Sequence, residues 1–231
     1  MTIDPNFEKN PSQISGIGTI PAVFGLLEIP STPGPHHAVI ILYGIAGWRP
    51  SYALLAKAYS DSGFVSLVLD YFAITGKGTT DAERQTMWPQ WQAMVRNAGL
   101  VLKNHPASKD QPVGLIGYSM GAYLAVSVAS SMPGIKAVVD FFGGVRPETI
   151  NNDLINLPPL LILHGDEDKV VPVSNAYALK NAVTARGGQV EMHIYRNEQH
   201  AFNAAWSSNY SQSASADSFH KTIAFLRRQL I

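Results

Sequence analysis

The chain has 231 residues, of which 46% are hydrophobic, and its 17 basic and 17 acidic residues cancel in formal charge. This length and apolar content suit one α/β domain over residues 1–231, and without a basic stripe we expect a small-molecule partner rather than nucleic acid or a membrane. The absence of cysteine excludes disulfides, thiolate metal ligands and a cysteine nucleophile.

The N-terminal sequence MTIDPNFEKNPS is polar and lacks the basic and apolar regions of a signal peptide. No run approaches the 18 apolar residues that predict a membrane helix. We therefore expect a cytoplasmic protein, although a chain whose leader had been removed would have the same sequence. The sequence indicates no particular oligomeric state.

Short apolar runs alternate along the chain with stretches of helical pattern. The segment 17–30 predicts one or two antiparallel edge strands, and buried strands are predicted at 38–44, 64–70, 113–118, 135–143, 159–165 and 190–196. Helices are predicted at about 50–61, 89–104, 120–131, 172–186 and 213–230. This alternation predicts an α/β fold with a mostly parallel central sheet and helices on both faces.

A proline marks the start of one predicted helix. Pro89 is expected to open the helix that follows it, which leaves 71–88 as a long irregular segment whose role is open. Trp88 and Trp91 lie at this joint and are either core anchors or part of a functional segment.

The stretch GLIGYSMGAYLAV (114–126) places Ser119 between Gly117 and Gly121, where a predicted strand gives way to a predicted helix. This is the setting of a nucleophile elbow, whose sharp turn needs residues without a side chain two positions before and after the nucleophile. The other interpretation is an ordinary turn serine. The strand-to-helix context favours the nucleophile.

A serine nucleophile needs a base and a carboxylate that orients the base, and in α/β-hydrolases the acid and then the histidine follow the serine in the sequence. HGDEDKVVP offers three carboxylates, of which we favour Asp168, because Asp166 is close enough to the strand end to serve the turn and Glu167 should face solvent. Asp168 then lies in an exposed crossover. His200, in the loop after strand 190–196, is the expected base.

The remaining histidines and the acidic cluster have simpler interpretations. His36, His37, His105, His193 and His220 are expected to be surface or structural residues. His164 lies at a strand end beside the acidic loop, where it serves either the site or only a local hydrogen bond. HGDED could suggest a metal site, but consecutive residues on a turn diverge, and we expect neither a metal nor a cofactor.

The oxyanion of an acyl-transfer intermediate needs two N–H donors, which we expect from Met120 and from Ile45 in the loop YGIAGW. Trp48, Tyr123 and Phe202 are the candidate apolar walls of the substrate site, and each is equally plausible as core.

The chain resembles the dienelactone hydrolase family of α/β-hydrolases from about residue 20 to its C-terminus. The resemblance rests on GYSMGA, on HGDEDKVVP and on HAF around His200. It implies the α/β-hydrolase fold and a triad of Ser119, Asp168 and His200. The namesake enzymes have cysteine as nucleophile and glutamate in the oxyanion loop, where this chain has Ser119 and Gly44, so the chemistry should be that of a serine hydrolase.

Those enzymes hold a substrate carboxylate with arginines, one of them at the place of Ala204 in this chain. Arg84 lies in the segment that carries the other and is either a substrate-binding residue or a surface arginine. The connection 144–159, where a lid is commonly inserted, is too short for a helical cap. We therefore expect no cap domain, a shallow site, a preference for short acyl esters and no interfacial activation.

These features predict a serine hydrolase that cleaves small carboxylic esters through an acyl-enzyme. A thioesterase or polyester hydrolase could use the same triad. A noncatalytic small-ligand-binding protein on the same fold is the alternative from another class.

Overall fold

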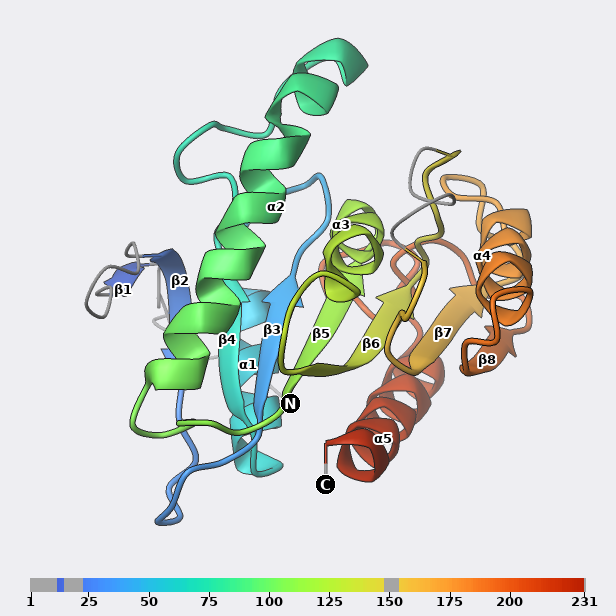
Figure 1. Cartoon of the computed structure of the whole chain (residues 1–231). Coiled ribbons are helices and arrows are strands. Elements are labelled where there is room, and N and C mark those ends of the chain that lie inside the picture. The colour runs from blue at the N-terminus through green and yellow to red at the C-terminus, as the bar shows by residue number, and fades with distance from the viewer. Residues whose placement is uncertain (1–11, 15–22, 148–153, 231) are drawn as a thin grey trace.

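The fold is built on one eight-stranded sheet, seen in a computed structural model that describes residues 12–14, 23–147 and 154–230 (Figure 1). The strands are β1 (Ser12–Ile14), β2 (Val23–Glu28), β3 (Ala38–Leu42), β4 (Val65–Leu69), β5 (Val113–Tyr118), β6 (Ile135–Phe141), β7 (Leu160–Gly165) and β8 (Val190–Tyr195). The helices are α1 (Ser51–Asp61), α2 (Asp81–Asn104), α3 (Met120–Ala129), α4 (Ser174–Thr184) and α5 (Gln212–Gln229).

The strand order is β1-β2-β4-β3-β5-β6-β7-β8. All neighbours from β4 to β8 are parallel, whereas β2 pairs antiparallel with β4 and β1 antiparallel with β2. The predicted mostly parallel α/β sheet is therefore confirmed. The antiparallel strand β2 lies within the predicted segment 17–30, of which residues 17–22 are outside the described part of the chain, but β2 is not an edge strand because β1 pairs with its outer side.

The helices cover both faces of the sheet, and two glycines on opposite faces of β5 show which helix covers which face. A side chain at Gly114 would contact Leu226 of α5, whereas one at Gly117 would meet Ala122 of α3. Ser66 of β4 donates a hydrogen bond to Ala56 of α1, and the register places Ser66 on the same face as Gly114. Helices α1 and α5 therefore share one face of the sheet, opposite α3.

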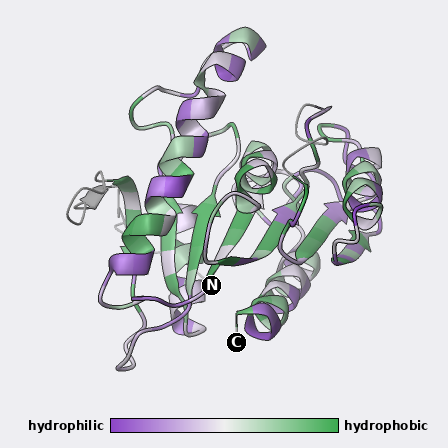
Figure 2. Ribbon diagram, in the orientation of Figure 1, coloured by the Kyte–Doolittle hydropathy of each residue, from purple (hydrophilic) through white to green (hydrophobic). Residues whose placement is uncertain are grey.

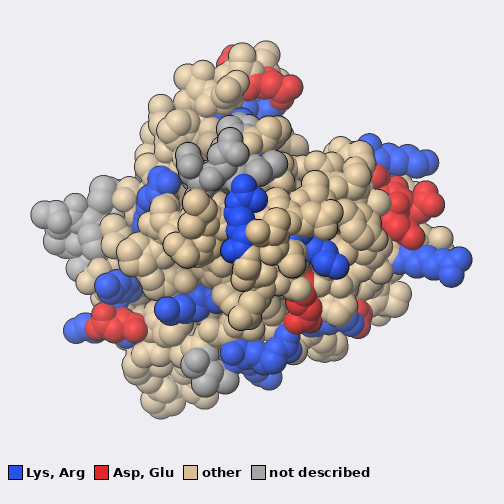
Figure 3. Space-filling view, turned by 45° about the vertical axis from the view of Figure 1, so that its right-hand side comes forward, with Lys and Arg blue, Asp and Glu red and all other residues tan. Residues whose placement is uncertain are grey.

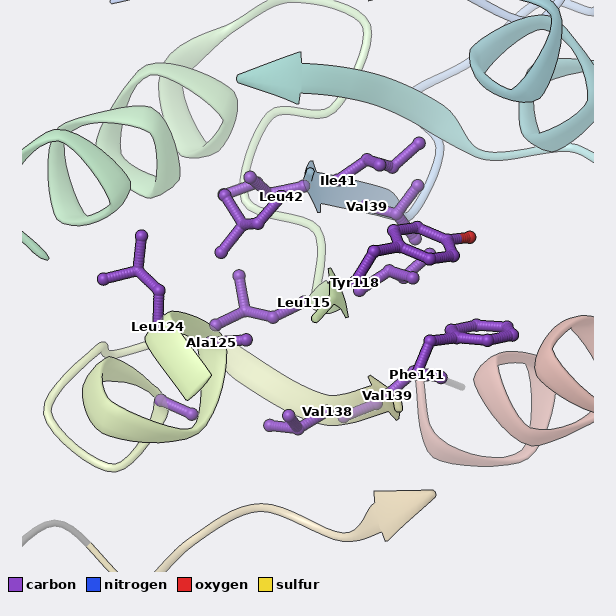
Figure 4. Packing of buried hydrophobic residues seen from close by; sticks show 14 of the residues in the cluster. Val39, Ile41, Leu42, Leu115, Tyr118, Leu124, Ala125, Val138, Val139 and Phe141 are labelled. Carbon is purple, nitrogen blue, oxygen red and sulfur yellow. The ribbon is translucent and has the colours of Figure 1, made fainter. Parts of the chain in front are cut away.

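The core consists of the central strands and the inner sides of the helices. Every residue of β3, β4 and β5 is buried, as expected for parallel strands covered on both faces. Figure 2 shows these strands as hydrophobic and the outer sides of the helices as more hydrophilic. In Figure 4, Leu115 and Leu124 lie on the α3 side of the sheet, while Tyr118 and Phe141 project from the other side.

Helix α2 begins at Asp81, eight residues before the predicted start at Pro89, so the expectation of an irregular segment 71–88 is wrong over its second half. The cause is a capping box: Glu83 N–H donates to Thr80 Oγ1 at 3.2 Å, and Thr80 N–H donates to Glu83 Oε2 at 3.1 Å. Pro89 therefore lies inside the helix, where its ring removes a hydrogen bond to the Gln85 carbonyl. Both residues are exposed, so water can hydrate that carbonyl.

The two tryptophans at this joint have different environments. Trp91 is fully buried and its indole N–H donates to Thr75 Oγ1 at 2.7 Å, so it is a core anchor. Trp88 is half-buried, and the Arg146 guanidinium lies 4.3 Å from the centre of its ring.

Charged residues are scattered over the face of the molecule that Figure 3 shows. In the face shown in Figure 3, Lys and Arg are separated by uncharged residues and by Asp and Glu. Within residues 12–14, 23–147 and 154–230, the structure holds no helix whose length and hydropathy would let it cross a membrane.

Candidate active site

Ser119 occupies a strained turn between β5 and α3. Its φ of +53° is in the left-handed region, which is unfavourable for a residue with a side chain. The turn is so tight that a Cβ on Gly121 would lie 2.2 Å from the Leu42 carbonyl oxygen, and one on Gly117 would lie 2.3 Å from Ala122 Cα. The two glycines of the motif are thus required by close backbone contacts, and they present Ser119 at the carboxyl end of the sheet.

Asp168 follows β7 and is buried, which corrects the expectation of an exposed crossover. The loop folds back over the carboxylate, and Val170 and Val171 donate backbone N–H groups to Oδ1 at 2.9 and 2.8 Å. Burial by itself would raise the pKa of Asp168, but the hydrogen bonds from His164, His200 and Val171 outweigh it and hold this pKa well below the usual range. Asp168 is therefore held as an anion.

His200 lies between Asp168 and Ser119 and contacts both. Its Nδ1 is 2.7 Å from Asp168 Oδ2, and its Nε2 is 3.1 Å from Ser119 Oγ. Because an ionised carboxylate only accepts hydrogen bonds, Nδ1 carries the proton, and Nε2 is free to accept from the serine hydroxyl. The structure thus brings the three predicted residues into one hydrogen-bonded chain.

Two neighbours fix the position of His200. Asn209 Nδ2 donates to the His200 carbonyl at 3.0 Å, and the Phe142 ring meets the imidazole edge to face, with 4.8 Å between ring centres. Phe142 itself has a φ of +42°. The sequence does not predict its place at the site, because the apolar pattern includes it in the strand predicted at 135–143. The glycine pair that follows it was the available signal that the strand ends there.

Of the other two carboxylates of the acidic loop, Glu167 faces solvent as predicted, whereas Asp166 binds a neighbouring loop instead of serving its own turn. Asp166 Oδ1 accepts a hydrogen bond from Asn197 N–H at 2.6 Å, which ties the loop after β7 to the loop after β8. Glu167 is exposed. Neither side chain is hydrogen-bonded to His200.

A second pair of ionisable residues lies beneath Asp168. His164 is fully buried, its Nε2 donates to the Val171 carbonyl at 2.8 Å, and the same atom is 3.4 Å from Asp168 Oδ2. Although burial opposes protonation of His164, its hydrogen bonds to Asp168 and Val171 and the charge of Asp140 raise its pKa overall. Asp140, also fully buried, was not singled out from the sequence because it lies inside an apolar strand.

The expected oxyanion donors lie on either side of Ser119. Met120 is the first residue of α3, where a backbone N–H has no acceptor within the helix. Ile45 belongs to a turn closed by the hydrogen bond from Gly47 N–H to the Gly44 carbonyl at 3.0 Å. A Cβ on Gly44 would lie 3.2 Å from Ser119 Cβ, so this loop packs directly against the nucleophile position.

A cavity of about 590 Å³ opens at Ser119 and His200. It extends over the sheet face formed by Tyr118 and Phe141 and into the space between α1 and α5. A volume in this range is typical of small-molecule sites. The expectation of a shallow site is therefore wrong, because the space between these two helices deepens the site beyond the loops at the strand ends.

Four residues expected to bind substrate do not line this cavity. Phe202 is fully buried and packs against Phe142 and Tyr195. The Tyr123 hydroxyl lies 3.5 Å from Asn175 Oδ1, and Trp48 packs against Tyr52 in the wall behind the cavity. Arg84 lies in the first turn of α2 and pairs with Asp81 at 2.5 Å, as the surface interpretation predicts.

Within the described residues, no group of three or more His, Asp or Glu side chains has an arrangement that could hold a metal ion.

Comparison with known proteins agrees with this architecture. Residues 23–230 match the model of the dienelactone hydrolase family. Carboxymethylenebutenolidase of Pseudomonas putida is 25% identical over 219 residues, which cover 88% of this chain and 90% of that protein. Acyl-coenzyme A thioesterase 1 of Mus musculus is 30% identical over 139 residues, which cover 59% of this chain and 31% of the thioesterase, so the chain spans about a third of that relative's length.

Among solved structures, dienelactone hydrolase from Anabaena variabilis superposes with a TM-score of 0.70 at 18% sequence identity, covering 96% of this chain and 99% of that one. This likeness shows the α/β-hydrolase fold. The family model extends from the first residue of β2 to the residue that follows α5, and this chain belongs to the dienelactone hydrolase family.

Proposed function

We propose that this protein is a serine hydrolase that cleaves carboxylic esters through an acyl-enzyme intermediate. The observation that carries the proposal is the bridging position of His200, 3.1 Å from Ser119 Oγ and 2.7 Å from Asp168 Oδ2. A hydroxyl becomes an effective nucleophile when a neighbouring base removes its proton, and the base works best when a carboxylate fixes its orientation. The cavity beside Ser119 gives the substrate room.

In the first half of the reaction, Ser119 Oγ attacks the ester carbonyl carbon while His200 Nε2 takes the hydroxyl proton. The carbonyl oxygen becomes an oxyanion, which the N–H groups of Met120 and Ile45 stabilise. The imidazolium is stabilised by Asp168, whose carboxylate is already buried and hydrogen-bonded. His200 then gives its proton to the alcohol oxygen, the carbon–oxygen bond breaks and the alcohol leaves.

In the second half, water replaces the alcohol. His200 takes a proton from the water, the hydroxide oxygen attacks the acyl carbon, and a second oxyanion forms in the same place. When this intermediate collapses, His200 returns the proton to Ser119 Oγ and the carboxylic acid is released. The enzyme is unchanged, and these steps need only the chain's own residues, the ester and water.

A thioester is the second candidate substrate, favoured by the 30% identity to an acyl-coenzyme A thioesterase over the aligned part. The two substrates are separated by comparing kcat/KM for p-nitrophenyl butyrate and butyryl-coenzyme A. We expect the ester to be preferred by at least roughly tenfold. The reverse preference would assign the protein to thioester hydrolysis.

The proposal is tested by labelling with a fluorophosphonate followed by peptide mass spectrometry. We expect the adduct on Ser119, sustained turnover of p-nitrophenyl butyrate, and a loss on the order of 10⁴-fold or more in kcat for Ser119→Ala. An adduct on another serine would refute the assignment of the nucleophile. A protein that binds the ester but never turns it over would be a receptor rather than an enzyme.

A further inference from the structure

The cavity continues away from Ser119 as a channel between two helices. Its walls include one side of α1 from Ser51 to Tyr59 and one side of α5 from Gln212 to His220. Eight residues of α-helix rise about 12 Å, so the channel follows more than two turns of each helix. Its base is the sheet face that carries Tyr118 and Phe141, whose rings stack with 4.7 Å between their centres.

The described lining of the channel carries no full charge. None of the described residues that line it is Asp, Glu, Lys or Arg, and the imidazoles among them are those of His200 at the reaction centre and of His220, an exposed residue beside Phe219. Arg49 is in contact with the rim, where its guanidinium lies 5.3 Å from the ring centre of Trp206, but it does not line the channel. A carboxylate drawn into this space would lose water without gaining an ionic partner.

The inner end of the channel is uncharged but not entirely apolar. Tyr59 is fully buried there, and its ring packs against Phe219 with 5.1 Å between centres. Ser218 is also fully buried, and its hydroxyl already donates to the Ser215 carbonyl. This end therefore accommodates a hydrocarbon chain, and among its described residues it offers an anion no Lys or Arg, only the exposed imidazole of His220.

The entrance is apolar as well. Of the nine large hydrophobic residues that are exposed in the described part of the chain, four line this cavity, namely Ile45, Val170, Trp206 and Tyr210. Single exposed hydrophobic residues need no explanation, but their concentration at one opening favours contact with an apolar ligand.

From these observations we propose that the channel between α1 and α5 binds an uncharged aliphatic arm of the ester, so that the preferred substrates are neutral esters with chains of up to about ten carbons. The length follows from the 12 Å of wall, because an extended chain advances about 1.2 Å per bond. The proposal rests on the ester hydrolase function proposed above. It replaces the expectation of short acyl esters, and it departs from a site that binds a charged substrate through arginines.

The first test uses the unmodified protein. Each methylene buried in the channel contributes about fourfold in binding, so kcat/KM should rise at least tenfold from p-nitrophenyl acetate to the octanoate. A parallel series with octyl and ethyl acetates shows whether the acyl or the alcohol arm occupies the channel. Flat or falling kcat/KM in both series would overturn the proposal.

The second test compares two esters with four-carbon acyl groups, p-nitrophenyl butyrate and p-nitrophenyl hemisuccinate, of which only the latter ends in a carboxylate. We expect the butyrate to be preferred by at least tenfold. Preference for the hemisuccinate would mean that a cation, with Arg49 the first candidate, receives the carboxylate, and the assignment of a neutral substrate would be wrong.

The third test narrows the channel. Ala216 and Ala224 are both exposed residues of α5, but only Ala216 lines the channel. Ala216→Trp should lower the ratio of kcat/KM for octanoate to that for acetate at least tenfold, whereas Ala224→Trp should leave this ratio within twofold of that of the unmodified protein. Equal ratios in both variants would contradict the proposal.

Failure of this inference is distinguishable from failure of the proposed function. If Ser119 is labelled and esters are turned over but chain length has no effect, the hydrolase stands and the channel assignment is wrong. If no ester or thioester is turned over and Ser119 is not labelled, the function itself is wrong.

Discussion

The buried carboxyl of Asp140 should make the stability of the protein depend on pH in a way that Asp140→Asn removes. Asp140 is fully buried on β6, and its Oδ1 accepts a hydrogen bond from Gly143 N–H at 2.8 Å. Its Oδ2 has no hydrogen-bond partner among the described residues. Burial raises the pKa of Asp140 from 3.8 to about 6, against the smaller lowering effects of the Gly143 N–H and of His164.

The sign and size of the effect follow from the two pKa values. Below about pH 4, the carboxyl is protonated in both the folded and the unfolded chain and costs nothing. Between about pH 4 and 6, the unfolded chain loses the proton while the folded chain keeps it, so stability falls as pH rises. At 1.36 kcal/mol per pKa unit, the loss is complete above pH 6 at about 3 kcal/mol.

Asparagine has nearly the same shape and cannot ionise. The difference in unfolding free energy between the Asp140→Asn variant and the unmodified protein should therefore grow in favour of the variant by about 3 kcal/mol from pH 4 to pH 8. For a chain of this size, this corresponds to a growth of roughly 6–12 °C in the difference between their Tm values. Urea unfolding of both proteins, followed by tryptophan fluorescence from pH 4 to 8, measures the difference. Asp61→Asn, at an exposed site on α1, controls for the loss of one carboxylate. A constant offset between the two curves, or a gap that widens toward low pH, would refute the reasoning.

Four further substitutions test the site and the start of α2. Asp168→Asn should lower kcat on the order of 10⁴-fold, whereas Asp166→Asn, which can still accept the Asn197 hydrogen bond, should lower it less than tenfold; steady-state kinetics of the two folded variants decides. Gly121→Ala should cost at least about 1–3 kcal/mol in unfolding free energy, because its Cβ would meet a backbone oxygen at 2.2 Å that cannot move alone, and a variant as stable as the unmodified protein in denaturant would contradict the tight turn. Thr80→Ala should cost about 1 kcal/mol through loss of the capping box and leave kcat/KM unchanged, since the start of α2 is remote from the cavity; a fall in kcat/KM would mean that this segment acts in catalysis.

The parts of the fold that were predictable are those in which one residue pattern has one physical solution. Apolar runs bounded by glycine, proline or aspartate suit parallel strands within a sheet, and the structure confirms all six as parallel strands, although the last of them, β8, is only partly buried. Their carboxyl ends lie at the same edge of the sheet, so residues that follow β5, β7 and β8 converge there. This is why Ser119, Asp168 and His200 could be selected from 19 serines, three neighbouring carboxylates and seven histidines.

Predictions from one local pattern are wrong where a second pattern opposes it. Pro89 alone predicts a helix start, but the two hydrogen bonds between Thr80 and Glu83 start the helix earlier. They outweigh the one hydrogen bond that Pro89 removes, because the freed carbonyl faces water. Phe202 and Tyr123 are close in sequence to His200 and Ser119 but do not line the cavity. Side chains next to each other on a strand or helix point in different directions, so that such nearness does not predict which face they join.

The space between α1 and α5 could not be predicted because it depends on the distance between two helices that are far apart in the chain. Helical periodicity indicates which side of each helix faces inward, but not whether the two inner sides touch. Their separation is set by what lies between them, namely Tyr59 and Phe219 from the helices and Tyr118 and Phe141 from the sheet. Large rings at these four places keep the helices apart without filling the volume.

Backbone strain is concentrated around the candidate site and is held there by the sheet. Ser119, Phe142 and Ala201 have φ values of +53°, +42° and +60°, and residues held in such conformations cost on the order of 1–3 kcal/mol each. The ladder of the sheet extends past the strand ends to fix two of them: Ser119 N–H donates to the Phe141 carbonyl and Phe142 N–H donates to the Leu163 carbonyl, both at 2.9 Å. These bonds persist because β5, β6 and β7 are completely buried except at Lys136, so the strands cannot shift in register without exposing their apolar residues. The strained serine and the aromatic ring against His200 are therefore positioned by the core of the sheet rather than by the preferences of the loops that carry them.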